Sequence, residues 1–474
     1  MMQKIKTGIK GLDRILKGGL IPRRVYVVTG GPGCGKTILA LHFLAEGVKN
    51  GERVLFITLS ESTENIKLNA KSIGINLEGI HFLDLTPSPK LLSFGYVPSS
   101  EEVEMDSLKR QTLECFNKIK PTRIVVDSVA LLRYLSPNMY QYRIEVLEIL
   151  KYITKSDATV LLTSESGVEV LDEDIQFVAD GVISIERDEF GDFRISVKKY
   201  RGSDFIKGAH FMKITNKGLE VYPVLTPKDF SSDFKAERIP SGVPELDKML
   251  NGGIPRGSVT LIIGPAGIGK TTLGLHFLIT AAHRGENSAL YAFDEDINSI
   301  LKRCDGINLP AREMVKKGFL SIKAIEPLEY RSEEIINLIL KDIKQNNIKF
   351  AMIDSLAGYM LSVRGEALTS NLHRICKILT NLGVTVILTD EIEEISGEII
   401  TTRVNFGHLV DNIIFMHYFM EEGVIKRAIG ILKMRFSNFE KDMREFKISS
   451  QGFVVCGKTL KFHAWACPPP ASEF

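Results

Sequence analysis

The stretch "VVTGGPGCGKT" at residues 27–37 runs from apolar residues into a glycine-rich turn that ends in Gly-Lys-Thr. The stretch "LIIGPAGIGKT" at residues 261–271 repeats it. Both match G-x-x-x-x-G-K-[ST] and lie between a predicted strand and a predicted helix, the context that identifies a P-loop. The glycines let backbone N–H groups converge on phosphate oxygens, and the helix amino terminus adds partial positive charge. Two phosphate-binding loops are therefore predicted.

The two loops predict a set of contacts with phosphate and metal. We expect Lys36 and Lys270 to reach the β- and γ-phosphates, and Thr37 and Thr271 to offer hydroxyls to Mg²⁺. The predicted cofactor-binding residues are Gly30, Gly31, Gly33, Cys34, Gly35, Lys36, Thr37 and Ile38 in the first copy, and Gly264, Ala266, Gly267, Ile268, Gly269, Lys270, Thr271 and Thr272 in the second.

The Mg²⁺ partner in such sites is an Asp at the end of a neighbouring buried strand. Asp127 in "RIVVDS" and Asp354 in "FAMIDS" fit that role, the alternative being an Asp that only caps the next turn. Cys34 lies inside the first loop, near a helix amino terminus, where a thiol pKa can fall. We interpret Cys34 as a tolerated filler residue, with a redox switch as the alternative.

The chain contains an internal duplication. "TGIKGLDRILKGGL" (7–20) is echoed by "SGVPELDKMLNGGI" (241–254), an offset of about 234 residues. The offset drops by about seven between "RIVVDSVALL" (123–132) and "FAMIDSLAGY" (350–359). A period this long indicates a duplicated domain rather than a solenoid. We predict domains at residues 1–226 and 235–455, followed by a disordered tail at 456–474.

Within each half, short apolar runs alternate with helical segments. Runs that are apolar throughout are typical of strands buried on both faces of a parallel sheet, and their alternation with helices indicates an α/β fold. "RISVKKYRG" and "RAIGILKMR" are predicted antiparallel additions. The predicted parallel strands are 25–29, 53–58, 123–127, 159–163 and 182–186 in the first half, and 259–263, 288–293, 350–354, 384–389 and 413–417 in the second.

Composition indicates an ordinary globular protein of 474 residues, with 44% hydrophobic and 25% charged residues. A formal net charge of +2 gives no global attraction to nucleic acid or membrane. The six cysteines contain no C-x-x-C pairing, and no apolar run approaches the roughly 18 residues of a membrane span. With no apolar signal region at the amino terminus, a cytoplasmic protein is predicted.

The motifs together resemble the KaiC family of tandem RecA-like ATPases over about residues 5–450. The resemblance rests on the two P-loops, the "GLD/ELD…GG" lead-ins, the "VDS" and "IDS" strands, and the basic closing segments "KKYRGS" (198–203) and "KMRFS" (433–437). It implies two tandem RecA-like P-loop NTPase domains, each a mostly parallel sheet flanked by helices. It also implies ATP and Mg²⁺ at both domains, a homo-hexameric ring with ATP between subunits, and slow hydrolysis.

In this family two adjacent glutamates end the second strand, and the leading one activates the attacking water. Here "TLSESTENI" (58–66) places Ser60 before Glu61, and "AFDEDINSI" (292–300) places Asp294 before Glu295. Serine cannot act as a base at neutral pH, whereas aspartate can, although it is one methylene shorter. We predict Glu61, Asp294 and Glu295 as catalytic residues and the second domain as the better hydrolase. The alternative is a solvated strand end.

The closing segments carry basic pairs spaced by two, which places each pair on one strand face. By resemblance, Lys199 with Arg201, and Lys433 with Arg435, reach the γ-phosphate of the neighbouring subunit and stabilise charge in phosphoryl transfer. The alternative is a solvated edge strand with basic side chains.

Clock members of the family autophosphorylate on an adjacent Ser/Thr pair, and Gly407 and His408 fall on those positions. Thr401 and Thr402 lie upstream, and nothing in their spacing requires modification, so serine/threonine autokinase activity is kept only as an alternative. The segments 164–176 and 390–403 are strongly acidic, which argues against threading of nucleic acid by a DNA-dependent ATPase. The leading prediction is an ATPase that acts as a signalling scaffold for a protein partner; a ring using ATP as structural glue is the other alternative.

Overall fold

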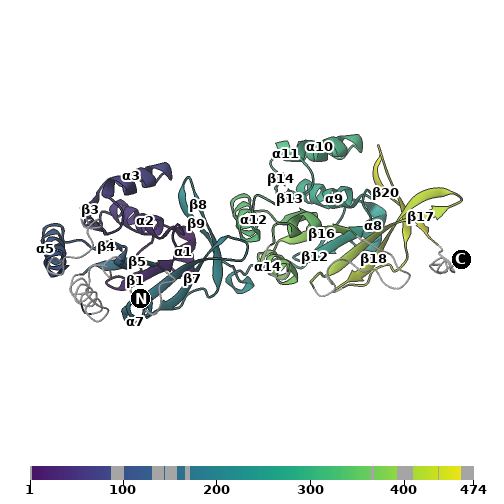
Figure 1. Ribbon diagram of the computed structural model, residues 1–474. Helices are drawn as coiled ribbons and strands as arrows, with labels where there is room; N and C mark the ends of the chain where they lie inside the picture. The colour runs from purple at the N-terminus through teal and green to yellow at the C-terminus, as the bar shows by residue number, and fades with distance from the viewer. Residues whose placement is uncertain are drawn as a thin grey trace, which may run out of the picture. The chain divides into compact units, whose positions relative to one another are not determined.

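The computed structural model describes residues 3–86, 101–130, 144, 157–165, 171–363, 368–391, 409–435 and 437–460. The chain divides into two compact units, Met1–Val224 and Leu225–Phe474. Figure 1 shows helices packed around a large sheet in each unit. The predicted α/β fold with two mostly parallel sheets is confirmed.

The first unit contains one nine-stranded sheet in the order β3-β2-β4-β5-β1-β6-β7-β8-β9. Its first six strands pair in parallel and the last three in antiparallel fashion. The strands are β1 (Val25–Gly30), β2 (Val54–Thr58), β3 (Ile80–Asp84), β4 (Arg123–Asp127), β5 (Thr159–Glu165), β6 (Gly181–Arg187), β7 (Phe193–Tyr200), β8 (Ala209–Thr215) and β9 (Gly218–Tyr222). The helices are α1 (Lys10–Ile15), α2 (Lys36–Lys49), α3 (Thr63–Ser72), α5 (Glu101–Ile119) and α7 (Leu171–Val178).

The second unit repeats this topology in the order β14-β13-β15-β16-β12-β17-β18-β19-β20, with a separate ribbon of β10 and β11. Its strands are β10 (Arg238–Ile239), β11 (Ile254–Pro255), β12 (Val259–Gly264), β13 (Ser288–Ala292), β14 (Leu320–Ala324), β15 (Phe350–Asp354), β16 (Thr385–Glu391), β17 (Asn412–Glu421), β18 (Val424–Met434), β19 (Arg444–Ser449) and β20 (Gly452–Thr459). Its helices are η2 (Pro227–Asp229), α8 (Pro244–Met249), α9 (Lys270–His283), α10 (Ile297–Gly306), α11 (Ala311–Lys316), α12 (Ser332–Asn346), α13 (Leu356–Met360) and α14 (Leu368–Asn381).

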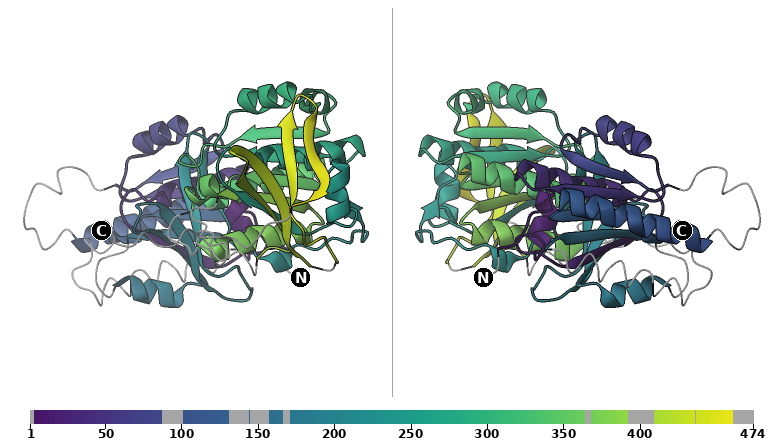
Figure 2. Two further views of the ribbon diagram at one scale, coloured as in Figure 1. Left: turned by 90° about the vertical axis from the view of Figure 1, so that its right-hand side faces the viewer. Right: turned by 90° about the vertical axis from the view of Figure 1, so that its left-hand side faces the viewer.

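The two faces of each sheet belong to different hydrophobic clusters, which explains why the parallel strands are apolar throughout. In β1, Tyr26 and Val28 lie in one cluster, whereas Val25 and Val27 lie in the other. Successive side chains of a strand point to opposite faces, so both faces of β1 are buried. Helices lie on both sides of the sheets in the two views of Figure 2.

Three features of the fold differ from the sequence prediction. The antiparallel strands β8, β9, β19 and β20 and the ribbon of β10 and β11 were not predicted individually. Strands β3 and β14, next to β2 and β13 at one end of each sheet, were not predicted, because each is only partly buried and lacks a continuous apolar run. The tail predicted from residue 456 begins too early, since β20 continues to Thr459 and pairs it with Arg444. The boundaries of the predicted domains otherwise stay predictions.

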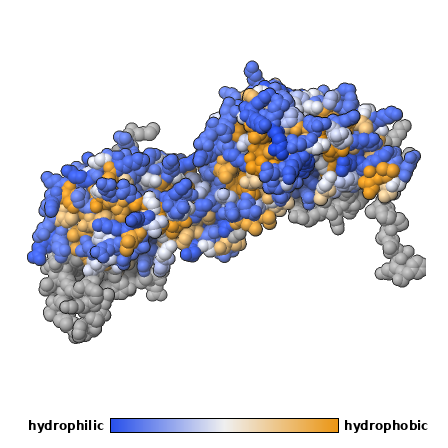
Figure 3. Space-filling view, turned by 90° about the horizontal axis from the view of Figure 1, so that it is seen from above, coloured by the Kyte–Doolittle hydropathy of each residue, from blue (hydrophilic) through white to orange (hydrophobic). Residues whose placement is uncertain are grey.

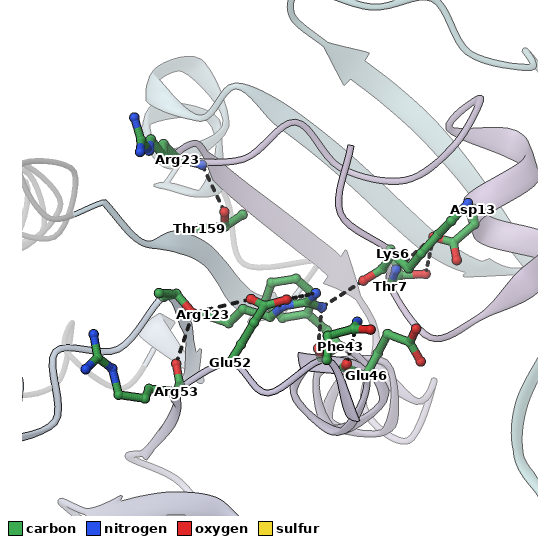
Figure 4. Close-up of polar contacts among 12 residues, drawn as sticks. Lys6, Thr7, Asp13, Arg23, Phe43, Glu46, Glu52, Arg53, Arg123 and Thr159 are labelled. Atoms are coloured by element: carbon green, nitrogen blue, oxygen red, sulfur yellow. Dashed lines mark hydrogen bonds and ion pairs between the residues drawn. The ribbon is translucent and has the colours of Figure 1, made fainter. Parts of the chain in front are cut away.

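In the first unit a buried arginine joins the lead-in segment to the P-loop helix (Figure 4). Arg123, 1% exposed, donates to the carbonyl oxygens of Lys6 at 2.7 Å and Phe43 at 2.8 Å, and forms an ion pair with Glu52. A Cβ at Gly47 would lie 2.8 Å from Arg123 Cδ, so only glycine leaves room for this side chain. The second unit carries Phe350 at the matching position of its sheet, stacked on Phe277.

Candidate nucleotide-binding sites

Each predicted phosphate loop connects the central strand of a sheet to a long helix. Gly35 and Gly269 precede α2 and α9 in left-handed conformation, with φ of 94° and 116°. Gly33 and Gly267 also have positive φ, which glycine adopts without steric cost. The predicted loop residues therefore lie in the strand–turn–helix context that a phosphate-binding loop requires, once in each unit.

The loop lysines fold back over their own loops. Lys36 Nζ donates to the carbonyl oxygens of Gly30 and Gly31 at 2.8 and 2.9 Å. Lys270 Nζ makes the same bonds to Gly264 and Pro265 at 2.9 and 3.0 Å. Burial lowers the pKa of Lys270. Both ammonium groups are thus held at the mouth of the loop, where phosphate oxygens would contact them.

The predicted metal ligands come together in both units. Thr37 Oγ1 donates to Asp127 Oδ2 at 2.7 Å, and Asp354 accepts a hydrogen bond from Thr271. The hydroxyl of Thr163 donates to the other oxygen of Asp127, and the hydroxyl of Thr389 donates to Asp354 Oδ1. Burial raises the pKa of Asp354.

One hydroxyl and one carboxylate per site suit Mg²⁺, which binds few protein oxygens and keeps several waters and phosphate oxygens. No group of three or more His, Cys, Asp or Glu arranged to hold a metal occurs among the described residues. The donor sets therefore fit a metal that arrives with its nucleotide rather than a resident all-protein metal centre.

The second unit has a cleft of about 470 Å³ at its P-loop. The cleft brings the predicted Asp294, Glu295 and Asp354 together with Lys270 and Thr271. The further residues that line it, which were not predicted as site residues, include Ser355, Arg303, Ile307, Glu391 and Arg427. The last four come from α10, from the residue that follows it, and from β16 and β18, so only the folded sheet reveals that they converge.

The leading residues at the strand ends have different surroundings in the two units. Asp294 Oδ2 accepts hydrogen bonds from the backbone N–H and the hydroxyl of Ser355, at 3.1 and 2.5 Å. Ser60 Oγ instead donates weakly to the carbonyl oxygen of Asp127 at 3.5 Å. Only the second unit therefore fixes a carboxylate at the leading position.

The trailing glutamates are each held by a residue eight positions later on the following helix. Asn69 Nδ2 donates to Glu61 Oε1 at 2.9 Å. Arg303 forms an ion pair with Glu295. The contact is the same in the two units, but the partner is neutral in one and cationic in the other.

The basic pairs lie away from the loops of their own units. Lys199 Nζ donates to the carbonyl oxygens of Gln176 and Phe177, and Arg201 also binds Phe177 O. Lys433 Nζ donates to Val410 O at 2.6 Å, and Arg435 pairs with Asp411 at 3.5 Å. Burial lowers the pKa of both lysines.

These contacts place the basic pairs at the amino ends of the parallel strands. Tyr200 pairs with Gly181 and Met434 with Asn412, at the first residues of β6 and β17. The phosphate loops follow the carboxyl ends of β1 and β12. A six-residue strand spans roughly 16–20 Å, so neither pair lies at the loop of its own unit.

The loop cysteine has the opposite character from a redox-active thiol. Cys34 is 3% exposed, and burial raises its pKa. Reactive cysteines are accessible and have a lowered pKa. Both observations argue against the redox-switch alternative and support the interpretation of Cys34 as a packed filler residue.

Several predictions fall outside the described residues. They concern Thr401, Thr402, Gly407 and His408, and most of the acidic segment 390–403, together with residues 166–170 of the other acidic segment.

A family model described as "ATPase: KaiC" matches residues 5–226 and again residues 239–459, almost the whole chain. The chain belongs to the KaiC family. It is 28% identical to the circadian clock oscillator protein KaiC of Picosynechococcus, over 96% of this chain and 90% of that protein. It is 28% identical to the circadian clock protein KaiC3 of Synechocystis (97% and 93% covered) and 29% identical to KaiC2 of the same organism (95% and 80%). The predicted resemblance to the KaiC family is thus confirmed, and by its family membership the chain is a KaiC-like ATPase.

The hydropathy of the helices and of the surface is typical of an ordinary folded protein. In the described part of the chain, no helix combines the length and hydropathy that crossing a bilayer requires. On the face shown in Figure 3, hydrophilic residues border the apolar patches.

Proposed function

We propose that this KaiC-family protein binds Mg·ATP at both domains and hydrolyses it slowly at the subunit interfaces of a hexameric ring. The nucleotide state would set the ring conformation and thereby the binding of a signalling protein. Relatives named circadian clock oscillator proteins support a regulatory rather than a metabolic role.

The observation that carries this proposal is the separation of each P-loop from the basic pair of the same unit. A complete phosphoryl-transfer site needs positive charge at the γ-phosphate. Lys199 with Arg201, and Lys433 with Arg435, lie at the opposite edge of the sheet from that position. We therefore propose that they serve a nucleotide held by another subunit, so that a head-to-tail assembly completes the site.

The roles of the residues follow from their positions. Backbone N–H groups of the loops and Lys36 or Lys270 would hold the phosphates, while Thr37 with Asp127, or Thr271 with Asp354, would hold Mg²⁺. Mg²⁺ would neutralise developing phosphate charge. Asp294 in the second domain, and Glu61 in the first, would orient and deprotonate the attacking water. Because Asp294 is fixed and Ser60 cannot act as a base, we propose that the second domain is the faster hydrolase.

A subunit-mixing experiment tests the assembly. Lys270→Ala removes ATP binding at the second domain, and Lys433→Ala with Arg435→Ala removes the pair donated to a neighbour. Each variant alone should lose second-domain turnover, whereas a mixture should regain part of it, because some interfaces combine an intact loop with an intact pair. Turnover that never exceeds the sum of the separate variants would contradict a site shared between subunits.

Mass analysis of the chain after incubation with ATP addresses the autokinase alternative. We expect no added phosphate, because Gly407 and His408 replace the acceptor pair. A stable gain of one phosphate would favour kinase activity instead. ATPase assays on Glu61→Gln and Asp294→Asn rank the two domains, and a larger loss in Glu61→Gln would reverse our assignment.

A further inference from the structure

Both units contain a contact between the strand-end glutamate and the helix that follows it, but the helix residue that makes the contact differs in charge. Asn69 and Arg303 each lie eight residues after their glutamate, on the second turn of α3 and of α10. Asn69 donates one neutral N–H to Glu61, at 2.9 Å from one oxygen only. Arg303 brings a full positive charge to Glu295 and itself lines the nucleotide cleft.

A general base must give up its existing contacts when it accepts a proton. For Glu295 that would mean losing an ion pair with a guanidinium, a charge-assisted contact that is stronger than a neutral hydrogen bond. For Glu61 it would mean losing only the neutral hydrogen bond from the Asn69 amide; in each glutamate the contact holds one oxygen, so the two differ in the charge of the partner. Glu61 is therefore both oriented and available, whereas Glu295 is engaged.

The leading residues show the complementary arrangement. Asp294 has both hydrogen bonds on one oxygen, from Ser355, which leaves the other oxygen for a water. Gly358 makes room for this arrangement, since a Cβ there would lie 2.7 Å from Asp294 Oδ1. Ser60 provides no carboxylate at all.

We propose that the residue at this helix position selects which strand-end carboxylate acts as the general base. Asn69 leaves Glu61 free to act in the first domain, and Arg303 withdraws Glu295 so that Asp294 acts in the second. In either domain the water oxygen bonds to the γ-phosphorus, its proton passes to the selected carboxylate, and the β–γ bridging bond breaks to give ADP and phosphate. This inference rests on the proposed function, and Asn69 and Arg303 are positioning residues in it.

The experiment uses the full chain. Hydrolysis in one domain is removed by substituting its strand-end carboxylates, which leaves nucleotide binding to that domain intact. The triple variant Glu61→Gln, Asp294→Asn, Glu295→Gln comes first, and it should show background turnover. If the triple variant hydrolysed ATP as fast as the wild type, these carboxylates would not be the general bases, and this inference would be wrong. A wild type that shows no turnover would refute the proposed function itself.

The second domain is then read in a Glu61→Gln background. Adding Asp294→Asn should nearly abolish turnover, because Glu295 is held by Arg303. Adding Arg303→Asn on top should raise turnover by up to roughly fivefold, the most that the loss of one exposed ion pair accounts for, because Glu295 is released into the role that Glu61 has beside Asn69. The KM for ATP should stay within about twofold while kcat changes. If, in the Glu61→Gln background, the protein with both Asp294→Asn and Arg303→Asn were as slow as the protein with Asp294→Asn alone, the proposal would be overturned.

The first domain is read in an Asp294→Asn, Glu295→Gln background. Asn69→Arg should lower its kcat by up to roughly fivefold without a matching rise in KM. Leu68→Arg is the matched control. It adds the same charge at the adjacent, preceding position of the helix, where the side chain is 67% exposed. Equal effects of the two substitutions would show that charge alone matters, and would contradict selection through the Glu61 contact.

Discussion

The backbone N–H and the hydroxyl of Ser355 both donate to a single carboxylate oxygen of Asp294, at 3.1 and 2.5 Å. Ser355 directly follows Asp354, the predicted metal ligand, and its hydroxyl also accepts from Gly358 N as the cap of α13. One residue therefore couples the carboxylate at the end of β13 to the carboxylate at the end of β15. Under the proposed function, we expect an aspartate, which is one methylene shorter than a glutamate, to depend on such support to reach a water in the correct geometry.

Ser355→Ala should lower the kcat of the second domain about tenfold, because it removes a hydrogen bond to a charged group and frees the carboxylate. The KM for ATP should change little, since the hydrogen bonds of the Ser355 hydroxyl are made with Asp294 and Gly358. Steady-state ATPase measurements in a Glu61→Gln background would detect the change. Ser355→Thr keeps the hydroxyl and should retain most of the activity. Equal losses in the Ala and Thr variants would show that packing, rather than the hydrogen bond, explains the effect.

Arg123→Ala should destabilise the first unit by about 3 kcal/mol, because it leaves two buried carbonyl oxygens unpaired and Glu52 without its partner. The second unit should be unaffected, since Phe350 packs on Phe277 at the matching position. Chemical denaturation followed by hydrogen exchange would assign the loss to the first unit. Arg53→Ala, at an exposed arginine directly before the neighbouring strand β2, should change stability by less than about 0.5 kcal/mol. Similar losses in the two variants would contradict the role assigned to burial.

The local parts of each site were predictable from sequence, whereas the side-chain partners were not. A P-loop is a contiguous pattern with one meaning, and the strand-end Asp127 and Asp354 follow from buried apolar runs. Ser355 and Arg303 were in view in the sequence, but their contacts depend on how β15 and α10 pack against β13. Nothing in a linear pattern reports that packing.

Burial explains why the sequence analysis did not predict the role of Arg123 or the strands β3 and β14. Arg123 begins an apolar run, and a charged residue at a strand start suggests exposure, yet the fold buries it against Phe43 and Glu52. Strands β3 and β14 were missed because they are half-buried at one end of the sheet. The duplication itself offers a comparison that was available: aligning the two copies pairs positions 60, 69 and 123 with 294, 303 and 350, and the residue type differs at each of these pairs.

Acidification should destabilise the second unit through His276. Burial lowers the pKa of His276 to about 4, against 6.5 for the unfolded chain. The unfolded state therefore binds the proton first, so the contribution of neutral His276 is complete above pH 6.5 and is lost as pH falls toward 4. The full effect corresponds to about 3 kcal/mol. Urea denaturation at pH 7 and at pH 4.5 should show this fall for wild type and a smaller one for His276→Leu. Parallel pH dependence in the two proteins would assign the effect to other groups.

ATP binding at the second domain should depend on Mg²⁺ more strongly than binding at the first. Carboxylates surround Lys270 at several strand ends: Asp294, Glu295, Asp354, Asp390 and Glu391, with Glu391 Oε1 at 3.9 Å from Lys270 Nζ. The first domain has Glu61, Asp127 and Glu165 at the matching positions, and serine in place of the other two. Two additional negative charges repel the triphosphate unless a cation intervenes.

Removal of Mg²⁺ should therefore weaken binding of a non-hydrolysable ATP analogue about tenfold more at the second domain than at the first. Calorimetric titration with and without EDTA would measure this, with the domains separated by Lys36→Ala and Lys270→Ala. Asp390→Ser introduces the residue of the first domain at a buried position and should narrow the difference. Ser164→Asp should make the first domain more dependent on Mg²⁺. Equal losses of affinity at the two domains would show that the loop, and not the surrounding carboxylates, determines the metal requirement.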